Sequence, residues 1–287
     1  ELLQQSVGEE QIEAFLRADN EMAATCLQVN TLLSDAQEAE QALTQLGIAF
    51  EKHPWLDGCY LVRGTGNLAQ LELFSSGKVY VQDPSARLAA MAAGAKPGMR
   101  VLDCCAAPGG KSFAAAIAMQ NEGSVTSCDI HAHKVSLIEK GAARLGVSIV
   151  HARQADASQF EPEFEAGFDV VIADVPCSGL GVIRKKPDIR YKDLAPMQKL
   201  PQVQAAILEN VSRYVKPGGV LVYSTCTVLK RENENVANAF LARHPEFRLE
   251  VFALPAGLDA QTDGMLTLYP HLHEADGFFI CKLRKNV

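Results

Sequence analysis

The fold is set by residues 101–112, which read VLDCCAAPGGKS. The segment starts as an apolar strand ending in an acid, turns through Gly109-Gly110 and continues into an alanine-rich stretch typical of a helix. A phosphate-binding loop of the Walker type needs glycine where Cys105 stands, and Pro108 fixes a φ angle inside the turn. The segment instead predicts the first strand–turn–helix unit of a Rossmann-like sheet, in which ligands bind at the carboxyl ends of the strands.

Strand and helix patterns alternate from Lys78 onward. The predicted strands cover residues 79–81, 100–104, 124–130, 148–152, 168–175, 218–226 and 277–283. This alternation predicts a mainly parallel sheet with helices on both faces. The last strand follows a long irregular stretch, so we expect it to join the sheet antiparallel. We assign residues 79–287 to this α/β, Rossmann-like domain.

The first 78 residues have a different pattern and predict a small α+β module over residues 1–78. A helix is expected over residues 8–20 and strands over 27–30 (LQVN) and 59–63. Ser34-Asp35 is a helix cap signal, and Gly47 follows as a stop. GTGNLA (64–69) matches a dinucleotide-binding pattern, but no strand–turn–helix of the right size follows it, so we interpret it as a loop.

Composition limits the class of protein. The 287 residues carry a net charge of −7 and 48% hydrophobic residues, as in a soluble globular protein rather than a globally basic nucleic-acid binder. The eight cysteines form no C-x-x-C pair, so we expect no metal site. No apolar run is long enough for a membrane span and no signal peptide is visible, which predicts a cytosolic protein with reduced thiols. We expect a monomer.

Acidic residues follow successive predicted strands. Asp129 ends the strand after the glycine turn, at the position that commonly binds ribose hydroxyls. Asp156 follows the next strand, where it would meet an adenine amino group, and Asp174 ends the one after. Each alone is more simply a turn or helix cap. Together they favour a nucleoside ligand, and the missing G-x-G-x-x-G favours S-adenosylmethionine over NAD.

Two cysteines end neighbouring predicted strands, Cys177 in DVPC and Cys226 in STC. Free cysteine is usually a small buried hydrophobe, which suits Cys26, Cys59, Cys104, Cys128 and Cys281 better. A thiolate that adds to carbon 6 of a pyrimidine makes carbon 5 nucleophilic enough to attack a sulfonium methyl group. Asp174 is expected near N3 of the base, where an acid stabilises the adduct. This chemistry alone leaves Cys177 and Cys226 nearly equal as the nucleophile.

RKKPDIRYK (184–192) is a basic segment directly after DVPCSG. A charge run is usually a solvated loop. Its position at the rim of the site predicts RNA contact through Arg184, Lys185, Lys186 and Arg190, with Tyr191 stacking on a base. The target cytosine must leave any stack to reach a thiol. Lys282, Arg284 and Lys285 would extend the patch or form a basic tail.

The chain resembles the RNA cytosine-C5 methyltransferase family of the Sun/Fmu (RsmB) type. The matching motifs are QDPSA (82–86), LDCCAAPGGKS (102–112), CDI (128–130), DVPCSGLGVIRKKPDIR (174–190), YSTCTV (223–228), RENE (231–234) and DGFFICKL (276–283). GVIRKKPDIR is similar to the bacterial 16S ribosomal RNA methyltransferase B branch, whose members carry an N-terminal NusB-like RNA-binding domain. No residues for that domain are present, so we expect a catalytic fragment.

This resemblance implies the roles of individual residues. Cys226 would be the nucleophile, and Cys177 would assist release of the methylated RNA. S-adenosylmethionine would be held by Cys105, Ala106, Ala107, Pro108, Gly109, Gly110, Lys111, Asp129, Asp156 and Asp174. The sequence departs from the family at Gln28, where arginine is frequent, which puts one RNA contact in doubt; Ser112 and Val175 are milder changes.

Three alternatives share much of this pattern. A non-catalytic ribosome-assembly factor would keep the fold, although both cysteines speak against it. A nucleoside triphosphatase is opposed by Cys105. An enzyme that methylates transfer RNA or another RNA would share every catalytic residue.

Overall fold

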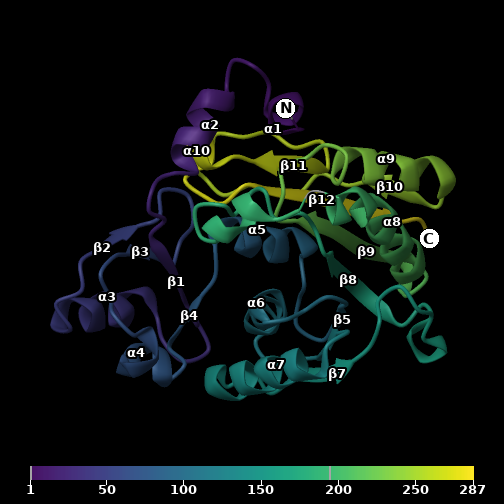
Figure 1. The fold of residues 1–287 in the computed structure, drawn as a ribbon. Coiled ribbons are helices and arrows are strands. Elements are labelled where there is room, and N and C mark those ends of the chain that lie inside the picture. Colours follow the sequence, from purple (N-terminus) through teal and green to yellow (C-terminus); the bar gives the residue numbers. More distant parts are fainter. Residues whose placement is uncertain (1, 194) are drawn as a thin grey trace.

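The chain folds around two β-sheets. The structure, a computed structural model, describes residues 2–193 and 195–287, so Glu1 of the predicted 1–78 module lies outside it. One sheet has four strands and the other eight. The small sheet and its helices α3 and α4 lie at the left in Figure 1, beside the large sheet.

The large sheet has the strand order β10-β12-β9-β8-β5-β6-β7, and β11 pairs with β12 outside this path. Strands β9, β8, β5, β6 and β7 are parallel to their neighbours, whereas β12 runs antiparallel to β9. The predicted Rossmann-like sheet and its antiparallel last strand are therefore confirmed. The strands are β5 (Arg100–Asp103), β6 (Ser124–Asp129), β7 (Val150–Gln154), β8 (Phe168–Asp174), β9 (Val215–Thr225), β10 (Phe247–Leu249), β11 (Met265–Leu268) and β12 (Phe278–Lys285).

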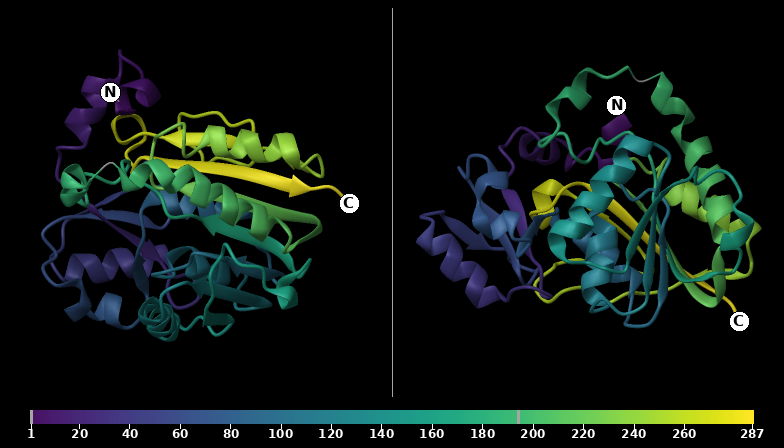
Figure 2. Two further views of the ribbon diagram at one scale, coloured as in Figure 1. Left: turned by 45° about the vertical axis from the view of Figure 1, so that its right-hand side comes forward. Right: turned by 90° about the horizontal axis from the view of Figure 1, so that it is seen from below.

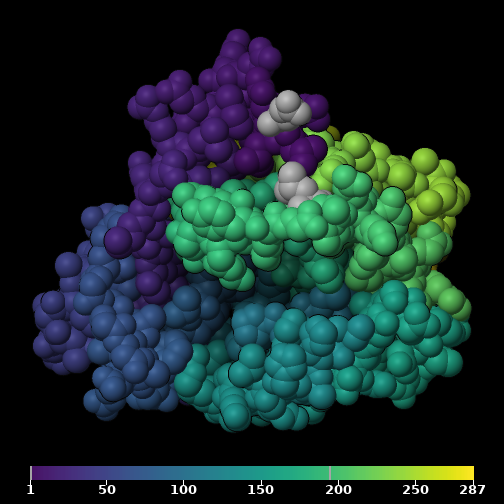
Figure 3. Space-filling model, in the orientation of Figure 1, coloured from purple at the N-terminus to yellow at the C-terminus, as the bar shows by residue number. Residues whose placement is uncertain are grey.

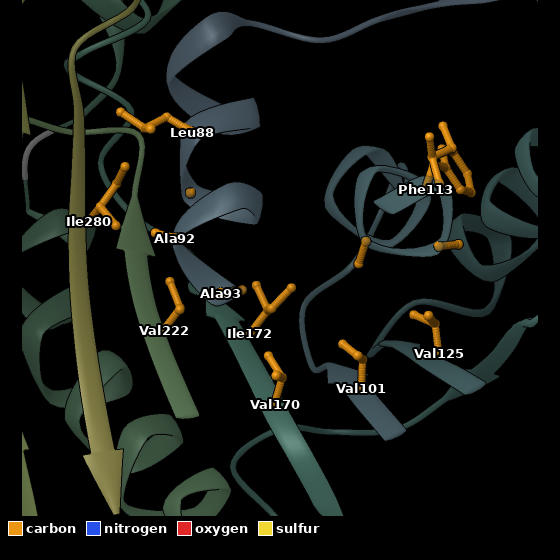
Figure 4. Close-up of a cluster of buried hydrophobic side chains, with 14 of the residues drawn as sticks. Leu88, Ala92, Ala93, Val101, Phe113, Val125, Val170, Ile172, Val222 and Ile280 are labelled. Atoms are coloured by element: carbon orange, nitrogen blue, oxygen red, sulfur yellow. The ribbon is translucent and has the colours of Figure 1, made fainter. Parts of the chain in front are cut away.

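Helices cover both faces of this sheet because its central strands are apolar on both sides. In β8, Val170 and Ile172 pack with α5 and α6, while Val171 and Ala173 pack with α8 and α9. Figure 4 shows the first layer, in which Leu88 of α5 faces Ile280 and Val222. The helices are α5 (Pro84–Ala93), α6 (Gly110–Ala118), α7 (Ala132–Leu145), α8 (Leu200–Ser212) and α9 (Glu234–Arg243).

The small sheet is antiparallel throughout, in the order β2-β3-β1-β4. Asp35 caps α3 as predicted, accepting the backbone N–H of Glu38 at 2.9 Å. The prediction for residues 79–81 was wrong in one respect: β4 pairs with β1 of the small sheet rather than joining the large one. The elements are β1 (Thr25–Val29), α3 (Ala36–Gln45), β2 (Phe50–Lys52), β3 (Cys59–Val62), α4 (Glu72–Ser75) and β4 (Val79–Val81).

The helix predicted over residues 8–20 is confirmed for residues 12–18. Gly8, at φ 95°, lies before it and separates two helices, of which the first was not predicted. They are α1 (Leu2–Val7) and α2 (Ile12–Ala18). Leu2 and Leu3 pack on Leu180 and Ile183, so α1 rests on the loop that follows Cys177. Figure 2 shows these helices above one end of the large sheet.

Short elements complete the chain. They are the helix α10 (Pro270–His273) and the 3₁₀ turns η1 (Leu68–Gln70), η2 (Pro162–Phe164), η3 (Pro187–Tyr191) and η4 (Pro196–Lys199). Among the helices of residues 2–193 and 195–287, none is long and apolar enough to cross a bilayer. The surface in Figure 3 is hollowed beneath the green segment near residue 190, on the side where the carboxyl ends of the parallel strands meet.

Candidate active site

The glycine turn joins β5 to α6. Gly109 has φ 108°, and a Cβ atom there would lie 2.3 Å from the ring of Phe113, so only glycine fits. Helix α6 begins at the next residue and points its free N–H groups toward the edge of the sheet. Lys111, in the first turn of α6, is buried and extends toward β8. The turn therefore places a helix N-terminus and one ammonium group at the same edge.

Asp129 and Asp156 line a pocket of about 400 Å³ beside this turn, together with Cys105 and Pro176. Both carboxylates also cap turns. One oxygen of Asp129 accepts the N–H of His131 at 2.9 Å, and one oxygen of Asp156 accepts the N–H of Ser158 at 2.9 Å. The simple turn-cap interpretation is thus correct for one oxygen of each, and the second oxygen is available to a ligand.

A second pocket of about 330 Å³ lies on the other side of Cys105, which lines both pockets. Its wall includes Lys111, Asp174, Lys186 and Cys226. The predicted cofactor and catalytic residues are therefore divided between two adjoining hollows. Asp129 and Asp156 line the first, Asp174 and Cys226 line the second, and the turn residues Ala106, Ala107, Pro108, Gly110 and Lys111 belong to the second.

Asp103 is a site residue to which the sequence analysis gave no role. Its Oδ2 accepts the hydroxyl of Ser112 at 2.7 Å. Its Oδ1 is buried and has no hydrogen-bond partner within the described residues, although the residue lines the second pocket. Burial raises the pKa of Asp103 to about 6, against the opposing hydrogen bond from Ser112. Asp103 ends β5, so it belongs with Asp129, Asp156 and Asp174 to the acids that the strand pattern predicts at this edge of the sheet.

The two cysteines meet at the end of adjacent strands. Parallel pairing sets Asp174 of β8 opposite Ser224 of β9, and the following loops bring Cys177 Sγ within 3.1 Å of Cys226 Sγ. The backbone N–H of Cys226 also donates to Cys177 Sγ at 3.2 Å. Both thiols therefore lie together at the carboxyl edge of the sheet, as the strand pattern predicts.

The surroundings shift the pKa values of these two thiols in opposite directions. The hydrogen bond with Cys177 lowers the pKa of Cys226, and the charges of Lys111 and Lys186 act in the same direction, while burial and Asp174 oppose them. The same hydrogen bond, together with burial, raises the pKa of Cys177 well above its ordinary value. The arrangement favours a Cys226 thiolate that accepts a hydrogen bond from the Cys177 thiol.

Asp174 is held between two donors. Its Oδ2 lies 2.6 Å from Lys111 Nζ, and its Oδ1 accepts the hydroxyl of Ser224 at 2.7 Å. Burial disfavours the ammonium group of Lys111, but the attraction of Asp174 outweighs it and raises the pKa of Lys111. The charged form of Lys111 is therefore favoured inside the pocket wall beside Asp174.

The structure distributes the predicted RNA-contacting residues unevenly. Lys186 lines the second pocket, and Tyr191 is 88% exposed. Arg184 pairs with Asp276 at 2.9 Å, and Lys185 pairs with Asp83 and Asp276. Arg190 donates to the carbonyl oxygen of Asp19 at 2.7 Å. A phosphate that contacts Arg184 or Lys185 would compete with these carboxylates, and Lys185 itself also lines the second pocket.

Other residues singled out in the sequence lie in the interior. Cys26, Cys59, Cys104, Cys128 and Cys281 are buried free thiols within the apolar cores. Gln28 is buried in β1 and donates to the carbonyl oxygen of Gln82 at 3.0 Å. Within the part of the chain that the structure describes, no group of three or more metal-binding side chains occurs.

Comparison with known proteins gives two family matches. Residues 90–284 match the model described as 16S rRNA methyltransferase RsmB/F. Residues 1–67 match the model of a ferredoxin-like domain of RsmF/B-like methyltransferases. The two matched ranges correspond broadly to the large sheet and the small module.

Individual relatives show the same likeness. A probable ribosomal RNA small subunit methyltransferase B from Bacillus subtilis is 43% identical over 268 residues, covering 91% of this chain and 59% of the relative. A ribosomal RNA small subunit methyltransferase F from Cronobacter sakazakii is 31% identical over 288 residues, covering 96% and 60%. The chain thus spans about three fifths of the length of these relatives.

Solved structures share the architecture. The crystal structure of PH0851 has a TM-score of 0.93 at 31% identity, covering 99% of this chain and 64% of that one. A methyltransferase homolog from Pyrococcus horikoshii has a TM-score of 0.83 at 29% identity, covering 99% and 93%. Both cover the small module as well as the large sheet.

Proposed function

We propose, on the premise that this chain belongs to the RsmB/F family of 16S ribosomal RNA methyltransferases, that it methylates carbon 5 of a cytosine in 16S ribosomal RNA. The methyl donor is S-adenosylmethionine and the reaction passes through a covalent adduct of cytosine carbon 6 with Cys226. The observation that carries this proposal is the thiol of Cys226 in the wall of a pocket that adjoins a second one, with the Cys177 thiol 3.1 Å behind it.

The residues at the two pockets fit the proposed cofactor. The available oxygens of Asp129 and Asp156 suit ribose hydroxyls and an adenine amino group. The buried, unpartnered Oδ1 of Asp103 suits an ammonium group, and the α6 N-terminus suits a carboxylate. When bound, S-adenosylmethionine supplies a methyl group on a positively charged sulfur.

Cys226 begins the reaction. Its thiolate adds to carbon 6 of the cytosine, and the electron pair of the C5–C6 double bond moves into the ring, which makes carbon 5 nucleophilic. Lys111 and Lys186 favour this thiolate because they lower the pKa of Cys226. N3 gains a proton as the adduct forms. Asp174 faces the N3 edge of the base, and the Lys111 ammonium group paired with it supplies this proton through the carboxylate.

Cys177 acts after the methyl transfer. Carbon 5 then gives its proton to solvent water, and the electron pair of that C–H bond re-forms the C5–C6 double bond. The bond between carbon 6 and Cys226 Sγ breaks, and its electron pair returns to Cys226. Because the Cys177 thiol lies within hydrogen-bonding distance of that sulfur, it stabilises the departing thiolate. RNA reaches the pocket along Lys186 and the exposed ring of Tyr191, with the target base out of its stack.

A methylation assay tests the reaction. The protein is incubated with S-adenosylmethionine and unmodified 16S RNA, and the nucleosides are analysed by mass spectrometry. We expect 5-methylcytidine with the native chain, none with Cys226→Ala, and a covalent protein–RNA adduct that persists with Cys177→Ala. Cys281→Ala is the matched control, because this thiol is buried in β12 away from both pockets.

Two results contradict the proposal. Formation of 5-methylcytidine by Cys226→Ala excludes Cys226 as the nucleophile. Methylation of a nitrogen or of ribose by the native chain excludes the carbon-5 reaction. If transfer RNA is methylated and 16S RNA is not, the chemistry stands and the substrate assignment fails.

A further inference from the structure

Two polar side chains are completely buried beneath the cysteine loops. Glu232 and Asn233 lie between β9 and α9 and are both 0% exposed. Neither lines one of the two pockets described above. Burying a carboxylate and an amide is unfavourable unless their hydrogen bonds are satisfied. Oε2 of Glu232 and both polar atoms of the Asn233 amide have partners, which show what these residues do, while Oε1 of Glu232 has none among the described residues.

Glu232 holds the loop of Cys177 on both sides of the cysteine. Its Oε2 accepts the backbone N–H of Ser178 at 2.9 Å and the Nε2 group of Gln204 at 3.0 Å. The same Gln204 nitrogen donates to the carbonyl oxygen of Pro176 at 3.0 Å. The residues before and after Cys177 are thus tied, directly or through one amide, to a single carboxylate.

Asn233 holds the loop of Cys226 in the same manner. Its Oδ1 accepts the hydroxyl of Thr225 at 2.6 Å, and its Nδ2 donates to the carbonyl oxygen of Thr227 at 2.9 Å. The two sides of Cys226 are therefore both bonded to one side chain. Because both oxygen and nitrogen of the amide are used, aspartate could not replace it without losing a donor.

The two loops are also joined to each other. The hydroxyl of Ser178 donates to Thr227 Oγ1 at 2.9 Å. Glu232 and Asn233 are consecutive residues, so a movement of one anchor displaces the other. The consecutive anchors Glu232 and Asn233 therefore hold two loops from different strands so that the two Sγ atoms lie 3.1 Å apart.

We infer that Glu232 and Asn233 are positioning residues, with Glu232 setting the place of Cys177 and Asn233 that of Cys226. Neither touches substrate or cofactor; each acts through the cysteine loop that it holds. Their effect on catalysis rests on the proposed function, whereas their effect on the geometry of the thiols does not. The two consequences can therefore be measured separately.

The first measurement uses the protein without RNA or cofactor. The rate of alkylation of Cys226 by iodoacetamide is followed against pH by peptide mass spectrometry. Loss of the Cys177 hydrogen bond in Glu232→Ala should raise the pH midpoint by about 1 pH unit, as Cys177→Ala does. Glu232→Gln keeps an acceptor for the Ser178 N–H and should retain the native midpoint.

Glu234→Ala is the matched control. This glutamate belongs to the same RENE motif but accepts a hydrogen bond from Thr267 of β11 rather than from a cysteine loop. We expect a native midpoint. A Glu232→Ala variant that folds with the native midpoint would overturn the inference, and so would an equal shift in Glu234→Ala, because the effect would then belong to α9 in general.

The second measurement follows the reaction with RNA. Glu232→Ala should accumulate the covalent adduct as Cys177→Ala does, while Asn233→Ala should form the adduct at least about tenfold more slowly. If thermal unfolding shows that Glu232→Ala does not fold, the test is made with Asn233→Ala. An Asn233→Ala variant that forms the adduct at the native rate would overturn the inference. If the native chain methylates no RNA, the proposed function fails. The pH profiles of alkylation still test whether Glu232 positions Cys177.

Discussion

Cys177 and Cys226 are identical side chains in contact, yet their surroundings move their pKa values in opposite directions. The difference arises from groups that only the folded chain brings together. Lys111 comes from α6 and Lys186 from the loop after β8, and both lower the pKa of Cys226. From the chemistry of the sequence the two cysteines were nearly equal as nucleophiles, and the electrostatics of the pocket now favour Cys226.

The contribution of Lys186 can be measured in the pH profile of methylation. The thiolate is the reactive form, so the rate rises as pH increases through the pKa of Cys226. Lys186→Gln removes a nearby positive charge, raises that pKa and moves the rising limb to higher pH. We expect the rate at pH 7 to fall roughly two- to fivefold and to recover at pH 9.

Lys192→Gln is the control for this prediction, because Lys192 belongs to the same basic segment but is exposed outside both pockets. A uniform loss of rate at all pH values in Lys186→Gln would mean that the lysine binds RNA without affecting Cys226.

Individual site residues could be predicted from the sequence where they directly follow a strand, because the end of that strand fixes their place at the edge of the sheet. Asp129, Asp156, Asp174 and the two cysteines all lie at the predicted edge of the sheet. The ion pairs of Arg184 and Lys185 were not predictable, because their partner Asp276 lies about ninety residues away in sequence. A local charge run does not show which charges the fold neutralises.

Between elements, Gly181 and Gly277 approach each other closely near the site. The N–H of Gly181 donates to the carbonyl oxygen of Cys226 at 3.1 Å, and the N–H of Gly277 donates to that of Gly181 at 2.8 Å. A Cβ atom on Gly181 would lie 1.9 Å from the oxygen of Gly277. The loop after Cys177 is therefore packed against the start of β12 without room for a side chain.

Gly181→Ala should displace this loop. We expect a destabilisation of roughly 1–3 kcal/mol, as for other overpacked positions, and a loss of methylation greater than the loss of folded protein. Thermal unfolding and the methylation assay measure the two effects. Gly47→Ala, where nothing lies within 4 Å, should cost about 1 kcal/mol through its positive φ and leave the rate unchanged. A fully active Gly181→Ala would contradict the packing described.

The elements themselves could be predicted to different degrees. The apolar runs of β5, β8 and β9, which alternate with helical stretches, were sufficient to predict the large sheet and its helices. The partner of β4 was not, because a strand of three residues carries no information about which sheet it joins. Strand β10 was missed because its three residues pair with the far end of β12. Strand β11 was missed because its four residues lie in a stretch that was interpreted as irregular.

Across the whole molecule, Asp19 connects distant parts of the chain. It follows α2, and it lies near Arg184 and Arg190 of the basic segment and near Asp276 before β12. Both oxygens of its carboxylate are buried without hydrogen-bond partners among the described residues. Burial raises the pKa of Asp19 to about 7, although the two arginines oppose this shift.

This shift predicts how stability depends on pH. The folded pKa of Asp19 lies above the unfolded value, so its contribution is fully present in acid and is lost as pH rises toward about 7. Asp19→Asn mimics the neutral form and should raise Tm at pH 8 by roughly 2–4 °C, and by less at pH 5, where only part of the loss has occurred. Calorimetry at both pH values tests this. A lower Tm at pH 8 would show that the ionised carboxylate stabilises the fold through its arginines.

The central claim is that Cys226 forms the bond to cytosine. The most direct measurement uses 16S RNA that contains 5-fluorocytidine, together with S-adenosylmethionine. Fluorine cannot leave carbon 5 as the proton does, so the adduct persists after methyl transfer and its peptide can be sequenced by mass spectrometry. We predict that the RNA fragment is attached to Cys226 and that Cys177→Ala forms the same adduct. Attachment to Cys177, or methyl transfer without any adduct, would contradict the claim.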